Sequence, residues 1–224
     1  LIFHYTGMKS EAAAIKRLTG VKSDVSCNYL IKRNGEIITM VPELYTAWHA
    51  GKSSWKNYKS LNKNSIGIEI TNPGHRHGYK KFSNSQIISV IKLSKFLIKK
   101  FKIDLKYILG HSDIAPERKK DPGEKFPWKY LAKKKIGYWH SLNEIMLFKN
   151  RNLKTNILQK KIFIKNLFKI GYSKKPTKNY KSVKDKYLKI ITKAFQRRFR
   201  PDLINGLIDR ECLIISQNLA KKLN

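Results

Sequence analysis

The chain has 224 residues, enough for one large domain or two unequal ones, and its 41% hydrophobic residues are sufficient to bury a core in either case. The formal net charge of +33 would suggest a polyanion-binding surface, but lysines spread from end to end beside abundant Ile and Asn favour a compositional bias, so we expect no specific nucleic-acid partner. No apolar run is long enough to cross a bilayer, and Cys27 and Cys212 match no disulfide or metal-binding spacing, so the sequence predicts neither a transmembrane segment nor a disulfide framework.

The first 150 residues alternate short β-branched runs with helical patterns. The runs predict strands at residues 1–6, 65–71 and 107–111, and a hairpin over 28–41 that turns at Asn34-Gly35. Apolar residues spaced by three and four predict helices at residues 11–18 and 85–100. This mixture predicts an α/β fold, in which helices flank a mixed central β-sheet.

The pattern changes near residue 150, where the strand signals stop. Helical patterns follow at residues 158–170, 184–199 and 209–223, separated by a polar linker at 171–182 and a turn at 201–206. We therefore predict two domains, an α/β domain at 1–150 and a small all-α three-helix domain at 151–224.

Three side chains before residue 150 could bind a metal ion together. Alternation places Ile2 and His4 on one face of the first strand, and His111 stands at the end of the strand "YILGH". Asp121 follows ten residues later through a loop bounded by prolines, close enough to fold back beside His111. Two imidazoles and one carboxylate are a known zinc set that leaves a fourth position for water. Considered alone, His111 would more often be a structural residue.

Glu69 is a second candidate for chemistry. In "SIGIEIT" the residues Ile66, Ile68 and Ile70 share one face of the strand, so Glu69 projects from the other face. Burial of a carboxylate is unfavourable unless it is paired or used. The alternative is an edge strand whose Glu69 faces water.

Six blocks of sequence resemble a known family. They are "FHYTG", "NYLIKRNGEI", "WHAGKSSW", "LNKNSIGIEITNPG", "ILGHSDIAPERKKDPGEKFPW" and "KIGYW", and they cover about the first 140 residues. In order and character they resemble zinc N-acetylmuramoyl-L-alanine amidases of the AmpD and AmiD type, which are relatives of phage lysozyme-amidases and peptidoglycan recognition proteins.

The resemblance implies catalytic roles for five residues. His4, His111 and Asp121 match the ligands of a single Zn²⁺ ion. Glu69 matches the general base that acts on the zinc-bound water, and Lys119 matches the cation that stabilises the oxyanion. Without the resemblance, Lys119 would be one more solvated lysine.

The resemblance also implies residues that contact the substrate. Trp48, His49 and Trp55 match a wall of the substrate groove, although without the resemblance they would be assigned to the core. Asn72 matches a residue that hydrogen-bonds the peptide. Asn28 stands where many relatives carry a His, so affinity or preference for part of the substrate is expected to differ.

The C-terminal third carries a second resemblance. "YLKIITKAFQRRFRPDLINGLIDRECLIISQNL" resembles the three-helix peptidoglycan-binding module of AmiD-like amidases, with "AFQRRFRP" and "NGLID" as its recognisable parts. A structural cap without sugar-binding capacity is the alternative.

The implied activity is hydrolysis of the amide between N-acetylmuramic acid, including its 1,6-anhydro form, and the L-alanine of peptidoglycan or muropeptides. This places the chain in cell-wall turnover and recycling; a non-catalytic peptidoglycan-binding protein is the alternative. The chain begins at Leu1 inside an apolar run, consistent with a removed upstream segment. We expect a monomer in the bacterial cell envelope or periplasm, with the cytoplasm as the alternative location.

Overall fold

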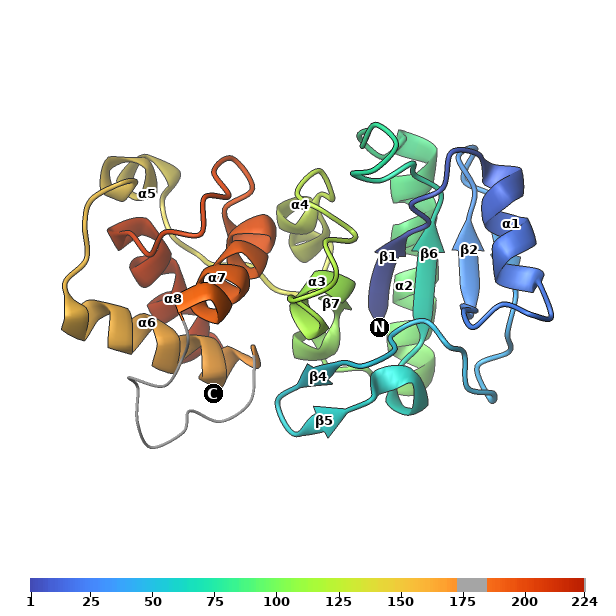
Figure 1. Cartoon of the computed structure of the whole chain (residues 1–224), viewed down its shortest axis with the longest axis horizontal. Helices are drawn as coiled ribbons and strands as arrows, with labels where there is room; N and C mark the ends of the chain where they lie inside the picture. Colours follow the sequence, from blue (N-terminus) through green and yellow to red (C-terminus); the bar gives the residue numbers. More distant parts are fainter. Residues whose placement is uncertain (173–184, 224) are drawn as a thin grey trace.

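A mixed β-sheet forms the centre of the first half of the protein (Figure 1). The structure is a computed structural model that describes residues 1–172 and 185–223. Within these residues the sheet has five strands in the order β3-β2-β6-β1-β7. Strands β2, β6, β1 and β7 run parallel, and β3 is antiparallel to β2. The strand bounds are β1 Ile2–Tyr5, β2 Tyr29–Ile31, β3 Ile37–Thr39, β6 Gly67–Ile70 and β7 Leu109–Gly110.

The predicted hairpin is confirmed. Strands β2 and β3 pair through Leu30 and Ile38, and the turn between them contains Gly35 with a φ of +91°. A Cβ at this position would also lie 2.8 Å from the carbonyl oxygen of Ser85, so both the backbone conformation and the space require glycine. A second, smaller hairpin, β4 (Ser54–Trp55) and β5 (Tyr58–Lys59), was not predicted.

One face of the sheet packs against α2 (Asn84–Phe101), which lies behind the strands in Figure 1. Phe3, Ile68 and Ile70 share a buried cluster with Val90 of this helix. The helix begins at a capping box formed by Ser83 and Gln86, which satisfies free backbone N–H groups of its first turn. At the far edge of the sheet lies α1 (Glu11–Thr19), capped by Ser10.

The C-terminal helices lie at the other end of the molecule (Figure 1) and share a core with the sheet. Ile2 and Leu109 belong to the same buried cluster as Phe163, Phe195 and Leu219. The predicted helices are confirmed as α6 (Ile157–Ile170), α7 (Asp185–Phe199) and α8 (Arg210–Lys222). The predicted linker falls mostly outside the described residues. Two further helices, α4 (Trp128–Lys133) and α5 (Glu144–Asn150), were not predicted.

The strand "YILGH" is shorter than predicted. It ends at Gly110, and His111 begins the short helix α3 (His111–Ile114). Asp113 stabilises the start of this helix, because its carboxylate accepts a hydrogen bond from the backbone N–H of Gly110 at 2.8 Å. Both cysteines are buried free thiols, and no helix of the described residues is long and apolar enough to span a membrane.

Candidate metal and catalytic site

The site lies where parallel strands end. His4 of β1 is the direct register partner of Glu69 of β6, and β1 is also paired with β7, after which His111 follows. Because the carboxyl ends of neighbouring parallel strands meet at one edge of a sheet, residues distant in sequence converge there. Asp121 reaches the same point through the loop after α3, where its backbone carbonyl accepts a hydrogen bond from the N–H of Ser112 at 2.8 Å.

Three potential ligand atoms converge in this buried site. The Nδ1 atoms of His4 and His111 are 2.8 Å apart, and they lie 3.0 and 2.9 Å from Oδ2 of Asp121. When each ring carries its proton on Nε2, all three atoms are electron-pair donors that point at one another, an arrangement that a divalent cation relieves. This group could hold a metal ion, and among the described residues it is the group of at least three His, Cys, Asp or Glu side chains that meets the geometry for one.

The electrostatics of the group favour the forms that bind metal. Burial, with a smaller contribution from the charge of His111, lowers the pKa of His4 to about 4, so its imidazole is neutral at neutral pH. Burial opposes ionisation of Asp121, but the charges and hydrogen bonds of His111 and His4 outweigh it and hold the pKa of Asp121 well below its usual value. A neutral imidazole and an ionised carboxylate are the states in which these side chains coordinate metals.

The dipeptide His49-Ala50 contacts the Nε2 atoms of both His4 and His111, the ring nitrogens that point away from Asp121. Nε2 of His4 lies 3.0 Å from Nδ1 of His49, and Nε2 of His111 lies 3.1 Å from the carbonyl oxygen of Ala50. The guanidinium of Arg118 donates to the same carbonyl and lies 3.3 Å from the His111 ring. No sequence signal identified Arg118, because its role depends on a carbonyl 68 residues away in the chain.

Glu69 has the environment of a proton-transfer group. Its Oε2 is buried and has no hydrogen-bond partner among the described residues. Burial raises the pKa of Glu69 to about 8, and the negative charge of Asp121 contributes to this rise. The positive charge of Lys119 opposes it. A carboxyl group with a pKa near neutrality can both accept and return a proton. The predicted projection of Glu69 from the face opposite Ile68 and Ile70 is confirmed.

A hollow of about 540 Å³ opens over this site. Its rim is basic, and its wall also includes the apolar side chains of Ala14, Leu18 and Val25. A larger hollow of about 660 Å³ lies near α4 and α5 but contains none of the candidate catalytic groups. The groups that line the hollow over the site include Arg17, His49, Glu69, Arg76, His111, Arg118, Lys119 and Asp121.

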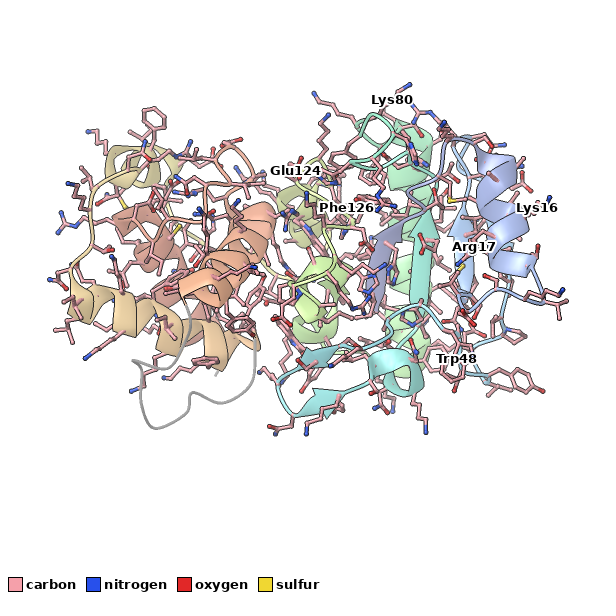
Figure 2. The ribbon with its side chains drawn as sticks, in the orientation of Figure 1. Lys16, Arg17, Trp48, Lys80, Glu124 and Phe126 are labelled. Carbon is pink, nitrogen blue, oxygen red and sulfur yellow. The ribbon has the colours of Figure 1, made fainter. Side chains whose placement is uncertain are left out.

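The predicted substrate-wall residues lie in different places. Trp48, labelled in Figure 2, is at the surface with 58% of its area exposed. His49 lines the hollow but is only 7% exposed, and its ring contacts His4. Trp55 was predicted to line the groove and instead lies in the core, 0% exposed, with its ring 5.0 Å from that of Tyr172. Trp55 packs there because β4 lies beneath Gly171 at the end of α6.

Asn28 and Asn72 are buried and are not among the residues that line the hollow. The side chain of Asn28 donates to the carbonyl of Val41 at 3.2 Å and accepts from the N–H of Gly67 at 2.9 Å. The side chain of Asn72 donates to the carbonyl of Lys80 at 2.8 Å and accepts from the N–H of Gly74 at 3.1 Å. Their amide groups are therefore used to hold loops against the sheet, which leaves them little capacity to bind a ligand.

Comparison with known proteins identifies close relatives. The family model described as N-acetylmuramoyl-L-alanine amidase matches residues 1–124. The N-acetylmuramoyl-L-alanine amidase AmiD of Escherichia coli (strain K12) is 32% identical over 234 residues, which cover 99% of this chain and 82% of that protein. The 1,6-anhydro-N-acetylmuramyl-L-alanine amidase AmpD of Enterobacter cloacae is 38% identical over 108 residues, 46% of this chain and 54% of the relative.

Solved structures show the same similarity in three dimensions. The complex of E. coli AmiD with anhydro-N-acetylmuramic acid-L-Ala-D-gamma-Glu-L-Lys has a TM-score of 0.84 and 33% identity, and the match covers 99% of this chain and 88% of that one. AmpDh3 from Pseudomonas aeruginosa has a TM-score of 0.83 and 31% identity, with 99% and 90% covered. The likeness therefore extends through the C-terminal helices.

Proposed function

Because the chain belongs to the N-acetylmuramoyl-L-alanine amidase family, we propose that it hydrolyses the amide between N-acetylmuramic acid and the L-alanine of the stem peptide. The observation that carries this proposal is the buried convergence of His4, His111 and Asp121 beside Glu69. The complex of E. coli AmiD with an anhydromuropeptide supports the 1,6-anhydro form as a substrate of this chain as well.

The resident metal in this proposal is Zn²⁺, held by His4, His111 and Asp121. Two imidazoles and one carboxylate suit zinc, and three protein ligands leave a position open for catalysis. When bound, the ion would lower the pKa of a water molecule and polarise the scissile carbonyl.

Two side chains of the hollow would take part in the reaction, one by transferring a proton and the other by stabilising a negative charge. Glu69 takes a proton from the attacking water and passes it to the leaving amine of L-alanine, for which a pKa near neutrality is suited. Lys119 lines the same hollow, where its ammonium group would stabilise the charge that develops on the carbonyl oxygen. The basic rim, with Arg17 and Arg76, suits the carboxylates of a stem peptide.

The C-terminal helices are the proposed peptidoglycan-binding part, with residues 1–150 as the catalytic domain and 151–224 as a three-helix domain. The support is the sequence resemblance together with the match to AmiD over 99% of the chain. We further propose a monomer that acts in the bacterial cell envelope, where the polymeric substrate is found.

Mass spectrometry of defined muropeptides tests the proposal. Muropeptides with and without the 1,6-anhydro ring are incubated with the protein as purified, after chelation and after zinc is restored. Release of free stem peptide that stops on chelation and returns with zinc is expected, and the relative rates identify the preferred substrate. Intact muropeptides in every sample, with zinc shown to be bound, would instead identify a non-catalytic peptidoglycan-binding protein.

A further inference from the structure

The dipeptide His49-Ala50 contacts both histidines of the candidate metal site from behind. The carbonyl oxygen of Ala50 can only accept a hydrogen bond, so its contact with Nε2 of His111 at 3.1 Å favours a proton on that nitrogen. The backbone therefore favours the metal-binding tautomer of His111 directly. His4 has no such carbonyl, because its Nε2 faces another imidazole, Nδ1 of His49, at 3.0 Å.

A short turn holds this dipeptide in place. The 3-10 helix η1 (Leu61–Asn64) supplies Asn62, whose side-chain oxygen accepts a hydrogen bond from the N–H of Ala50 at 2.7 Å. Directly after the turn, Oγ of Ser65 lies 3.3 Å from Nε2 of His49. The same Oγ donates to the carbonyl oxygen of Leu61 at 2.6 Å. Both nitrogens of the His49 ring are thus engaged within the protein.

The central sheet also fixes the position of the His49 ring, which packs against Gly67 of β6. A Cβ at Gly67 would lie 2.3 Å from the His49 ring, so any side chain at this strand position would displace the imidazole. Gly67 precedes Glu69 on the same face of β6, so one strand both makes room for His49 and presents Glu69. The imidazole rings of His4 and His49 meet edge to face, with centroids 5.1 Å apart.

The contacts run from His4 through His49 and Ser65 to the carbonyl oxygen of Leu61, and this carbonyl sets the direction of every hydrogen bond before it. The hydroxyl of Ser65 donates its single proton to the carbonyl oxygen of Leu61. Towards His49 it can therefore only accept a hydrogen bond, which Nε2 of His49 donates. A neutral His49 then has an unprotonated Nδ1, which accepts from Nε2 of His4. A neutral His4 is left with an electron pair on Nδ1, the atom that faces His111 and Asp121.

We propose that His49 and Ser65 are positioning residues that hold His4 in the tautomer that binds metal, through a one-way relay from His4 to His49, Ser65 and the carbonyl of Leu61. The inference rests on the proposed zinc site. It assigns His49 a role different from that of a substrate-wall residue, because a ring that is 7% exposed and bonded at both nitrogens orients a ligand.

Zinc affinity, measured by competition with a chelator of known affinity, tests the relay. Ser65→Ala is expected to raise the zinc dissociation constant about 10-fold, the low end of the effect of losing a partner of a metal ligand, because Ser65 acts on His4 only through His49. Ser65→Thr keeps the hydroxyl and is expected to rescue most of the affinity. Ser53→Ala is the matched control: Ser53 also contacts this turn, by accepting from the N–H of Leu61 at 3.1 Å, but it lies off the relay. A Ser65→Ala variant with wild-type affinity, or an equal loss in Ser53→Ala, would overturn the proposal.

Nitrogen-15 spectra of the histidine rings report which ring nitrogen of His49 carries the proton. This property would not change in Ser65→Ala if Ser65 had only a structural role. In the zinc-loaded wild type, His49 is expected to carry its proton on Nε2, and in Ser65→Ala this preference is expected to be lost while the melting temperature changes little. A wild-type His49 protonated on Nδ1 would refute the relay. If the wild type binds zinc and cleaves muropeptides while Ser65→Ala binds zinc normally, only this inference fails; a wild type that binds no zinc removes the proposed function itself.

Discussion

Replacement of Arg198 by Met is expected to destabilise the protein strongly, because it leaves a charge buried without its partner. Arg198 of α7 donates to Oδ2 of Asp113 at 2.5 Å, and each side chain is only 1% exposed. Arg198 also donates to the carbonyl of Ile108 at 3.0 Å and lies over the ring of Trp128 at 4.1 Å. The remaining carboxylate of Asp113 would keep only the N–H of Gly110 and the hydroxyl of Tyr172.

The magnitude follows from the burial of the pair. Removal of one partner of a buried ion pair costs about 3 to 5 kcal/mol of unfolding free energy. For a chain of this length, about 1 kcal/mol corresponds to a change of roughly 2 to 4 °C in melting temperature, so Arg198→Met should melt about 6 to 20 °C below the wild type. Because Asp113 lies in the helix that begins with His111, zinc affinity should fall as well.

Thermal and urea unfolding of metal-free protein, followed by circular dichroism, measure the effect. The double variant Arg198→Met with Asp113→Asn removes both charges and is expected to regain part of the lost stability, with a coupling energy of about 1 to 3 kcal/mol in the double-mutant cycle. A loss below about 1 kcal/mol in Arg198→Met, or a double variant less stable than the single one, would refute the reasoning.

Three further predictions concern catalysis and pH. Glu69→Ala is expected to abolish stem-peptide release while zinc stays bound, and full activity with bound zinc would contradict its role as base. Lys119→Ala should lower kcat about 100- to 1,000-fold with little change in KM, whereas a change in KM alone would assign Lys119 to substrate binding. Burial lowers the pKa of His140 to about 4, so its contribution to stability is present above pH 6.5 and is lost as the pH falls from 6.5 through 4. The stability of the wild type relative to His140→Gln should therefore drop by up to about 3 kcal/mol between pH 7.5 and 4, and a constant difference across this range would exclude the effect.

Much of the fold could be predicted from local patterns. Alternation identified β1 and β6, the Asn34-Gly35 pair identified the hairpin, and apolar spacing identified α2 and the three C-terminal helices. Several short elements escaped prediction, because a two-residue strand such as β4 and the single turn of α3 contain too few residues to show a period.

The sequence by itself determined the kinds of element and the residue types of the metal site. His4 and Glu69 could be chosen because each lies on a strand, where local alternation sets the direction of the side chain. His111 could be chosen because it ends a predicted strand, and Asp121 because it follows ten residues later through a proline-bounded loop. The family resemblance then gave these four residues their roles.

Only the tertiary structure decided what supports that site. His49 meets His4 across 45 residues of chain, and Arg198 meets Asp113 across 85. Trp55, an aromatic residue in a predicted groove motif, entered the core because the C-terminal helices cover it. Periodicity records which face of an element a residue occupies, but the identity of the opposing element depends on how distant segments pack together, and no local pattern carries that information.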